Sequence, residues 1–256
     1  MAMPAPVEDF YANIPNVLRA QGFRLRSHEA EMFGNVTMRM TNDEAGGWLS
    51  ALLNSTTGRD HAATGRRYLE WGTGGSTVVV AWLASKPGWR LNADVIDSDP
   101  AWVKQMLSRY GMLKKGVDEA RVHVWIESLG QLAAWGNPKG WALRNSSVRL
   151  NQSRAYVEHF DESSCCFDTI LVDGRFRHAC LMHALKLSHS STNVVVHDSQ
   201  RYVTPGKQTR SDKLYDVQLQ IGQLAVLRPK PSSLLAARSG SLDSAYYEGI
   251  LDNPAR

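Results

Sequence analysis

Residues 68–77, YLEWGTGGST, decide the fold that this sequence predicts. A short apolar run leads into the stretch, and the strongly apolar VVVAWLA of residues 78–84 follows it. This order indicates a strand, a tight glycine loop and a helix, the entrance to a nucleotide site in an α/β fold. Because glycine has no Cβ, the backbone at Gly72, Gly74 and Gly75 can come close to a ligand. The alternative is a glycine turn that merely lets the helix pack on the strand.

Two residues of this stretch indicate which ligand it suits. A dinucleotide fingerprint has glycine or alanine where this chain has Thr77, so nothing in the loop asks for a pyrophosphate. Glu70 lies two positions before the first glycine, and a carboxylate beside two phosphates is repulsive. The pair therefore disfavours a nicotinamide oxidoreductase and favours a cationic ligand.

A second strand is expected to end in an acid that binds a ribose. Residues 91–97 form a short run that ends in Asp97, about 25 residues after Gly72. Nucleotide folds place the ribose-binding acid about 20 residues after the glycine loop. A carboxylate there can accept charge-assisted hydrogen bonds from both ribose hydroxyls. Asp99 is better explained as a helix cap, because Pro100 follows it at the first helical position.

Two later apolar runs also end in residues that carry chemistry. Residues 167–172 lead to Asp173, and residues 193–196 lead to His197 and Asp198. In an open parallel sheet, ligands lie beyond the carboxyl ends of the strands. We therefore expect the acids that end all four strands to lie on one rim: Glu70, Asp97, Asp173 and Asp198.

In combination, four segments resemble a little-characterised group of class I S-adenosylmethionine-dependent methyltransferase-like proteins: residues 69–77, 97–102, 172–177 and 196–198. Residues 224–230 fit the closing strand of that group, and the resemblance covers roughly residues 40 to 250. It implies a Rossmann-like, doubly wound, mostly parallel seven-stranded sheet with a C-terminal antiparallel strand and N-terminal helices. The chain departs from the group at Ser190–Asn193, where many members have a Pro-Gly-Gly turn, and its polar residues are expected to form a turn there.

The resemblance implies S-adenosylmethionine as the cofactor, but it says almost nothing about the acceptor. Its cofactor-binding set here is Glu70, Gly72, Thr73, Gly74, Gly75, Ser76, Asp97, Ser98, Glu127, Ser128 and Asp173. For proton transfer from an oxygen or nitrogen acceptor, the candidates are His197, Asp173 and Asp198. His197 is attractive because the ordinary pKa of histidine lies near neutrality, although the sequence slightly favours the alternative, a strand-end histidine bonded to backbone. Asp173 and Asp198 would also be the ligands of a divalent cation such as Mg²⁺, a variant that the sequence does not favour because no third carboxylate is evident.

The acceptor side is expected around an insertion at residues 127–165, which is far longer than an ordinary connection between strands. Trp135 and Tyr156 could line an acceptor pocket there, or pack the insertion on the domain. Arg175 and Arg177, next to the rim, could bind a carboxylate, a phosphate or a glycan-linked acid, and a solvated role is equally open for at least one of them.

The chain is expected to have three parts: an N-terminal helical cover (1–60), a cofactor-binding domain (61–230) and a C-terminal tail (231–256). Thr41 and Glu44 form a capping-box pattern at the start of the helix near 42–54. Residues 231–243 are expected to be a loop before a short tail helix. The other expected helices lie near 9–20, 76–85 and 100–112, and the strands near 67–71, 92–97, 121–126, 167–172, 193–197, 214–219 and 223–228.

Composition narrows the classes of function. The chain has 256 residues, a net charge of +4 and no run of five or six like charges, so nucleic acid is not an expected partner. It has no stretch of about 18 apolar residues and no N-terminal signal pattern, so we expect a soluble cytoplasmic protein, with an organelle left open. The three cysteines, two of them adjacent, indicate neither a disulfide framework nor a zinc site.

The function expected is methyl transfer from S-adenosylmethionine to oxygen or nitrogen of a small-molecule or glycan-type acceptor. The alternative is a non-catalytic protein that binds S-adenosylmethionine as a partner subunit or sensor. The sequence does not indicate the oligomeric state.

Overall fold

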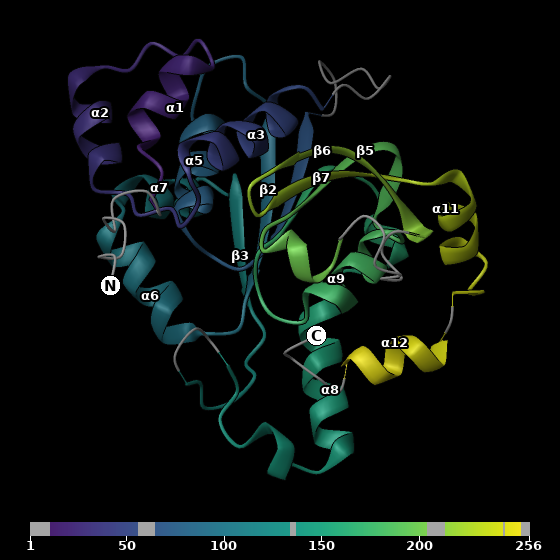
Figure 1. Ribbon diagram of the computed structural model, residues 1–256. Helices are drawn as coiled ribbons and strands as arrows, with labels where there is room; N and C mark the ends of the chain where they lie inside the picture. Colours follow the sequence, from purple (N-terminus) through teal and green to yellow (C-terminus); the bar gives the residue numbers. More distant parts are fainter. Residues whose placement is uncertain (1–10, 56–64, 134–136, 204–212, 243, 252–256) are drawn as a thin grey trace, which may run out of the picture.

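The computed structural model describes residues 11–55, 65–133, 137–203, 213–242 and 244–251 (Figure 1). They form a seven-stranded sheet of order β3-β2-β1-β4-β5-β7-β6. Only β7 runs antiparallel to its neighbours, β5 and β6, among the strands of this sheet. The expected doubly wound α/β fold with a C-terminal antiparallel strand is confirmed. The strands are β1 (Arg66–Trp71), β2 (Leu91–Asp97), β3 (Val122–Ile126), β4 (Phe167–Val172), β5 (Ser188–Val196), β6 (Tyr215–Ile221) and β7 (Leu224–Pro229).

Helices cover both faces of the sheet (Figure 1). In the part of the chain that the structure describes, three single turns of 3-10 helix lie in the connections: η3 (Trp141–Leu143), η4 (Glu162–Ser164) and η5 (Ser199–Arg201). The α-helices are α1 (Ile14–Ala20), α2 (Ser27–Gly34), α3 (Asn42–Leu53), α5 (Gly75–Ala84), α6 (Pro100–Arg109), α7 (Gly111–Asp118), α8 (Ser146–Val157), α9 (Arg177–Ala184), α11 (Pro231–Arg238) and α12 (Ser244–Leu251).

The central strands are buried on both faces, as is usual for parallel strands that helices cover. Successive side chains of β1 point to opposite faces, because a strand has a period of two. Tyr68 packs into an apolar core with α1, α3 and α5, whereas Leu69 and Trp71 pack into a second core with α8, α9 and α11. The same alternation turns Glu70 toward the face that carries the N-terminal helices.

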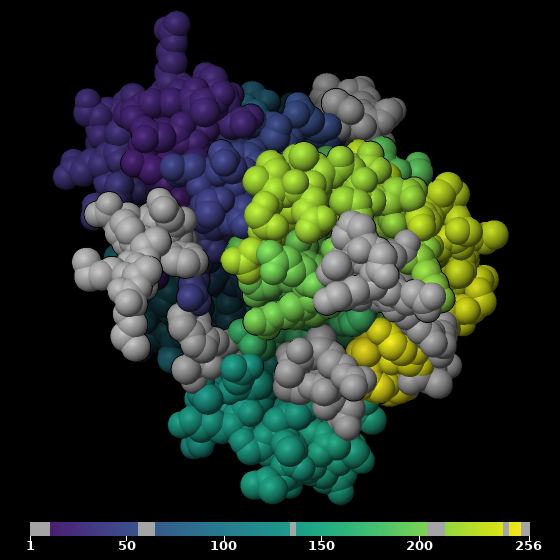
Figure 2. All heavy atoms as spheres, viewed as in Figure 1, coloured from purple at the N-terminus to yellow at the C-terminus, as the bar shows by residue number. Residues whose placement is uncertain are grey.

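The N-terminal helices are tied to the strands that end at the rim. The capping box at the start of α3 is confirmed: Thr41 N donates to Glu44 Oε2 at 2.8 Å. The other oxygen of Glu44 accepts a hydrogen bond from Gln223 N, in the β6–β7 turn, at 2.5 Å. Asn193 Nδ2, in β5, donates to Ala51 O at 2.7 Å. Figure 2 shows the result: the purple and blue N-terminal helices lie beside the yellow-green hairpin, while the teal insertion lies at the opposite end.

Before β3, the helices differ from the sequence analysis in two places. Helix α2 was not expected, and the helix expected over 100–112 is two helices, α6 and α7, which meet at the extended residue Tyr110. Gly111 and Gly116 lower the intrinsic preference of α7 for helix. Tertiary packing overrides this preference, because a Cβ on Gly116 would touch Val122 and Ala81 at 3.1 and 3.2 Å.

Two expectations of irregular structure are wrong. Residues 231–238 form α11, whose first residue is Pro231, a favoured first position. Ser190–Asn193 belong to β5 and make no turn. Thr192 Oγ1 donates to Phe167 O at 2.7 Å and accepts from His189 N at 2.9 Å, so its hydroxyl satisfies backbone groups where the pairing of β4 with β5 shifts register.

In the described part of the chain, no disulfide bond joins one helix or strand to another. Cys165 and Cys166 are bonded to each other, and Cys180 is buried and reduced. Among the described residues, no helix is long and apolar enough to cross a membrane.

Candidate functional site

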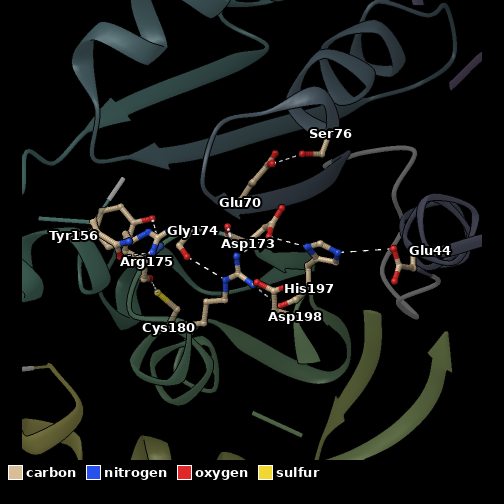
Figure 3. Close-up of polar contacts among 12 residues, drawn as sticks. Glu44, Glu70, Ser76, Tyr156, Asp173, Gly174, Arg175, Cys180, His197 and Asp198 are labelled. Atoms are coloured by element: carbon tan, nitrogen blue, oxygen red, sulfur yellow. Dashed lines mark hydrogen bonds and ion pairs between the residues drawn. The ribbon is translucent and has the colours of Figure 1, made fainter. Parts of the chain in front are cut away.

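The carboxyl ends of β1, β2, β4 and β5 meet at one rim of the sheet. Figure 3 shows Glu70 and Ser76 above Asp173, with His197 between Asp173 and Glu44 on one side and Arg175 beside Tyr156 on the other. The arrangement follows from parallel pairing, because β1 lies between β2 and β4, and β5 adjoins β4. The four acids expected on this rim are therefore brought to the same edge of the sheet.

Glu70 lies beneath the glycine loop and is fully buried. Its carboxylate accepts hydrogen bonds from Ser76 Oγ, from Thr77 Oγ1 at 3.1 Å and from Tyr68 OH at 3.2 Å. Burial raises the pKa of Glu70 to about 8, against the opposing effect of the Ser76 and Thr77 hydroxyls. Glu70 therefore fastens the start of α5 to β1 and is mostly protonated at neutral pH.

The three glycines of the loop are required for three different reasons. Gly72 has φ +103°, a conformation that side chains disfavour, and a Cβ there would lie 3.0 Å from the backbone of Gly174. A Cβ on Gly75 would lie 2.6 Å from Thr37 O, so this glycine lets the N-terminal segment pack on α5. Within the described residues, a Cβ on Gly74 would meet only one atom within 4 Å, a serine hydroxyl at 3.9 Å. Gly74 is therefore the loop glycine that borders open space.

Asp97 is held at the end of β2 by the same loop. Thr73 N donates to its Oδ2 at 2.6 Å and Asp99 N to its Oδ1 at 2.8 Å, and the residue is 7% exposed. Burial raises its pKa, while these backbone amides lower it. Trp102 Nε1 donates to Thr73 O at 2.7 Å, so α6 also braces the loop. Ser98, the next residue of the expected cofactor set, is buried beside Asp97.

Glu127 and Ser128 follow β3 and extend the rim past Asp97. Glu127 N donates to Asp97 O at 2.9 Å, which fixes the backbone of the two strand ends together. The carboxylate of Glu127 is half-buried and lies 2.7 Å from His159 Nδ1. Ser128 is exposed, and its hydroxyl accepts a hydrogen bond from Gly130 N at 3.2 Å. Glu127 therefore has a partner from the insertion, while Ser128 stays open to solvent.

Arg177 joins the ends of β4 and β5 from below the rim. Its guanidinium donates to Gly174 O at 3.1 Å, to His197 O at 2.7 Å and to Asp173 O at 3.0 Å. It also pairs with Asp173 Oδ1 at 3.0 Å and Asp198 Oδ2 at 2.6 Å. Burial lowers the pKa of Arg177, but the two carboxylates outweigh this effect and raise the pKa above its ordinary value. Because protein acceptors occupy this guanidinium, the expected contact with the acceptor has no geometric support at Arg177.

His197 lies between two carboxylates from different parts of the chain. Its Nδ1 is 3.2 Å from Asp173 Oδ1, and its Nε2 is 3.8 Å from Glu44 Oε2 (Figure 3). Burial lowers the pKa of His197, but the hydrogen bond and charge of Asp173 outweigh it and raise the pKa above its ordinary value. Its side chain is bonded to a carboxylate, so a strand-end histidine that merely bonds backbone does not describe it.

The Asp173 carboxylate contacts both Arg177 and His197 through the same oxygen, Oδ1. Burial raises its pKa, yet Arg177 and His197 together bring the pKa below its ordinary value, so Asp173 is ionised at neutral pH. Its side chain is 30% exposed. Arg177 and His197 both contact Oδ1 of the carboxylate, which leaves Oδ2 without a partner among the described residues. Asp173 is therefore an accessible, oriented carboxylate at the centre of the rim.

Two residues at the rim adopt backbone conformations that side chains disfavour. Phe176 follows β4 with φ +52°, and Asp198 follows β5 with φ +55°. Each costs of order 1–3 kcal/mol and persists only where the surroundings enforce it. Phe176 is completely buried, and Asp198 is bound by Arg177. Such conformations are concentrated at functional sites.

The insertion supports the rim through Tyr156. Tyr156 OH accepts a hydrogen bond from Arg175 N at 3.2 Å, and a Cβ on Gly174 would collide with that hydroxyl. Burial raises the pKa of Tyr156, whose side chain is 1% exposed. Trp141 packs on Phe176 with ring centroids 5.5 Å apart. Tyr156 therefore packs the insertion on the domain, and Trp135, the other expected acceptor contact, lies outside the described residues.

The residues at the rim do not suit Mg²⁺. A divalent cation would need Asp173 and Asp198, but the Arg177 guanidinium bridges these two carboxylates. No group of three or more histidine, cysteine or acidic residues in the described ranges could hold a metal ion. No step of the chemistry is routed through a metal.

Two residues of this site were not identified from the sequence. Glu44 was explained by its capping box, and nothing local indicates that its carboxylate also approaches His197. Trp102 belongs to a segment that carried the resemblance, but its bond to the loop carbonyl depends on how α6 leaves β2.

Comparisons with known proteins give the fold a limited context. No protein-family model and no curated protein matches the chain. Among solved structures, a "putative O-methyltransferase" from Klebsiella pneumoniae is 16% identical with a TM-score of 0.42, over 89% of this chain and 92% of that one. An O-methyltransferase from Bacillus cereus in complex with SAH is 14% identical with a TM-score of 0.41, over 90% and 94%. MtNAS in complex with MTA and tNA is 11% identical with a TM-score of 0.33, over 73% and 61%. All three TM-scores are below 0.5, so these similarities assign no function to the chain.

Proposed function

We propose that the rim binds S-adenosylmethionine and transfers its methyl group to oxygen or nitrogen of a small-molecule acceptor. One observation carries the proposal: among the described residues the glycine loop borders open space at Gly74, while Thr73 N of the same loop binds the Asp97 carboxylate and Gly72 adjoins the backbone of Asp173. A cofactor with an adenosine at one end and positive charges at the other suits a site with these two acids.

The residues fit the adenosine part of this cofactor. Each oxygen of Asp97 accepts one backbone amide, from Thr73 or Asp99. An ionised carboxylate has about four acceptor positions, so Asp97 can still accept ribose hydroxyls. Its two amide bonds fix the direction of those positions before the ligand arrives. Ser98, Glu127 and Ser128, which continue the same edge, are the residues proposed to line the adenine side.

The residues also fit the charged part. The cofactor supplies a methyl group on a positively charged sulfur. Asp173 is ionised, and its Oδ2 is available to a cation. Glu70 lies deeper and is close enough to Asp173 for the Asp173 charge to raise its pKa. A cation bound between them would favour loss of the Glu70 proton, because an adjacent positive charge stabilises the carboxylate.

We assign the contact with the reacting groups to Asp173. Positioning the acceptor beside the donor removes much of the barrier to such a displacement. Asp173 Oδ2 can accept a hydrogen bond from the acceptor hydroxyl or amine, while His197 and Arg177 keep the carboxylate ionised and oriented through Oδ1. The acceptor oxygen or nitrogen would form the new bond to the methyl carbon as the carbon–sulfur bond breaks and the sulfur leaves as a neutral thioether. The acceptor proton would pass to water, because the lowered pKa of Asp173 makes it a weak base. His197 is a positioning residue in this scheme, because its raised pKa makes it a poor proton acceptor at neutral pH.

The test is an assay of methyl transfer from radiolabelled S-adenosylmethionine to a panel of phenols, amines and acidic sugars. We expect labelled product with at least one acceptor class, equal rates in EDTA and in Mg²⁺, and loss of product in Asp173→Asn. Binding of S-adenosylmethionine with no product from any acceptor would favour the alternative, a non-catalytic binding protein. A rate that depends on Mg²⁺ would contradict the role given to Arg177.

A further inference from the structure

Two arginines, Arg175 and Arg177, follow β4 and differ in what their side chains contact. The Arg177 guanidinium donates to acceptors of four neighbouring residues and is buried. The Arg175 guanidinium makes one hydrogen bond in the described residues, from Nη1 to Asn137 Oδ1 at 2.8 Å. Because a guanidinium has five N–H donors, most of those on Arg175 have no protein acceptor there.

The backbone around Arg175 is held rigidly, so its side chain has a fixed origin. Arg175 N donates to Tyr156 OH at 3.2 Å, and Cys180 Sγ donates to Arg175 O at 3.3 Å. Gly174 packs against the Tyr156 hydroxyl, and Phe176 is buried in a left-handed conformation. This part of the chain is therefore fixed before any ligand arrives, which lowers the entropy lost on binding.

Arg175 makes no direct ion pair among the described residues and is half-buried. Burial lowers its pKa, the Arg177 charge lowers it further, and the nearby Asp173 charge offsets only part of this effect. Taking a cation out of water is costly unless an opposite charge or hydrogen bonds compensate it. A bound anion would supply both.

The position of Arg175 places this anion next to the proposed reaction centre. Figure 3 shows Arg175 and His197 on opposite sides of Asp173. Tyr202, at the end of η5, is near enough to affect the pKa of both arginines.

We propose that Arg175 anchors an anion subsite, so that the methyl acceptor carries an acidic oxygen group, a carboxylate or a phosphate, bound by its guanidinium. The identification of this anion as part of the methyl acceptor rests on the proposed function. A planar guanidinium binds either group through paired hydrogen bonds. The acceptor atom would then lie within one small molecule's reach of Asp173.

The test uses inorganic phosphate and malonate as probes on the full chain saturated with S-adenosylhomocysteine. Binding is followed by NMR, from the backbone amide signals of Gly174 and Phe176 and from the side-chain Nε–H signal of Arg175. We expect saturable shifts with at least one probe and a dissociation constant about tenfold or more higher in Arg175→Gln, since a charge-assisted hydrogen bond is lost. Arg175→Lys should be intermediate, because it keeps the charge but loses the fork.

Arg154→Gln is the matched control, because Arg154 is an arginine of the adjacent helix α8 that pairs with Glu248. It should leave both affinities unchanged. Shifts with malonate alone indicate a carboxylate acceptor, and shifts with phosphate alone a phosphorylated one. Absence of shifts with both probes, or equal affinity in Arg175→Gln, would overturn the inference. Anion binding by a protein that does not bind S-adenosylhomocysteine would support the anion site and refute the proposed methyl transfer instead.

Discussion

A serine substitution at Gly74 or at its neighbour Gly75 should separate binding from folding. At Gly75 the new Cβ would lie 2.6 Å from Thr37 O and 2.9 Å from Met38 Cβ, closer than real side chains approach, and the first of these is backbone. Overpacking of this kind costs about 1–3 kcal/mol. With about 2–4 °C of melting temperature per kcal/mol for a chain of this size, Gly75→Ser should melt roughly 2–12 °C lower.

At Gly74 the added atoms would enter open space, and the residue has the extended backbone of a helix N-cap, where serine is favoured. The cost in stability should stay within about 0.5 kcal/mol. The same atoms would meet a ligand lying on the loop, and one misfit of about 1–3 kcal/mol weakens binding roughly 5–150-fold.

The assays are differential scanning calorimetry and calorimetric titration with S-adenosylhomocysteine. We expect Gly74→Ser to bind S-adenosylhomocysteine more weakly with an unchanged melting temperature. We expect Gly75→Ser to have a lower melting temperature. Unchanged affinity in Gly74→Ser would refute the assignment of this glycine to the ligand. A large loss of stability in Gly74→Ser would show that the space beside it is not open.

Three further outcomes follow from the charges at the rim. Glu70 keeps its proton in the folded state up to a pKa of about 8 but loses it near 4.5 when unfolded, so folding stability should fall as pH rises between these values. The free energy of unfolding of Glu70→Gln in urea should not fall over this pH range. If it depends on pH as the original protein's does, the assignment of a raised pKa to the buried Glu70 is wrong. Asp173→Asn should lower the pKa of His197 in an NMR titration, because Asp173 raises it. The stability that this pair contributes is present below pH 6.5 and is lost as pH rises through the folded pKa of His197. A pKa of His197 that is the same in Asp173→Asn and in the original protein would refute the contact. Arg177→Gln should cost about 1–3 kcal/mol in urea unfolding, since it removes a buried guanidinium that bonds three backbone carbonyls and two half-buried carboxylates. Arg175→Gln should cost less than about 0.5 kcal/mol, and equal losses would refute the distinction between the two arginines.

The sheet was predictable because its signals are local. Each strand is an apolar run with a recognisable end, and the loop from Gly72 to Gly75 marks the first crossover. The rim follows from these ends once the strands are parallel, so Asp97 and Asp173 could be placed together without coordinates. The helices that the sequence missed depend on tertiary packing, as the contact of Gly116 with Val122 shows.

The roles of single side chains at the rim could not be predicted in the same way. Arg175 and Arg177 are two residues apart and have the same chemistry, and only the left-handed turn at Phe176 decides which guanidinium is directed into the protein. The approach of Glu44 to His197 joins two distant parts of the chain, so no spacing in the sequence could indicate it. Long-range contacts of this kind depend on how the N-terminal helices are held on β5 and β7.

The central claim is that the loop at Gly74 binds S-adenosylmethionine between Asp97 and Asp173. Calorimetric titration of the purified chain with S-adenosylmethionine, with NAD as the competing dinucleotide, tests it most directly. We expect one site per chain with micromolar affinity for S-adenosylmethionine and no binding of NAD, because Thr77 stands where a dinucleotide fingerprint has glycine or alanine. Binding of NAD, or no binding of either compound, would contradict the claim.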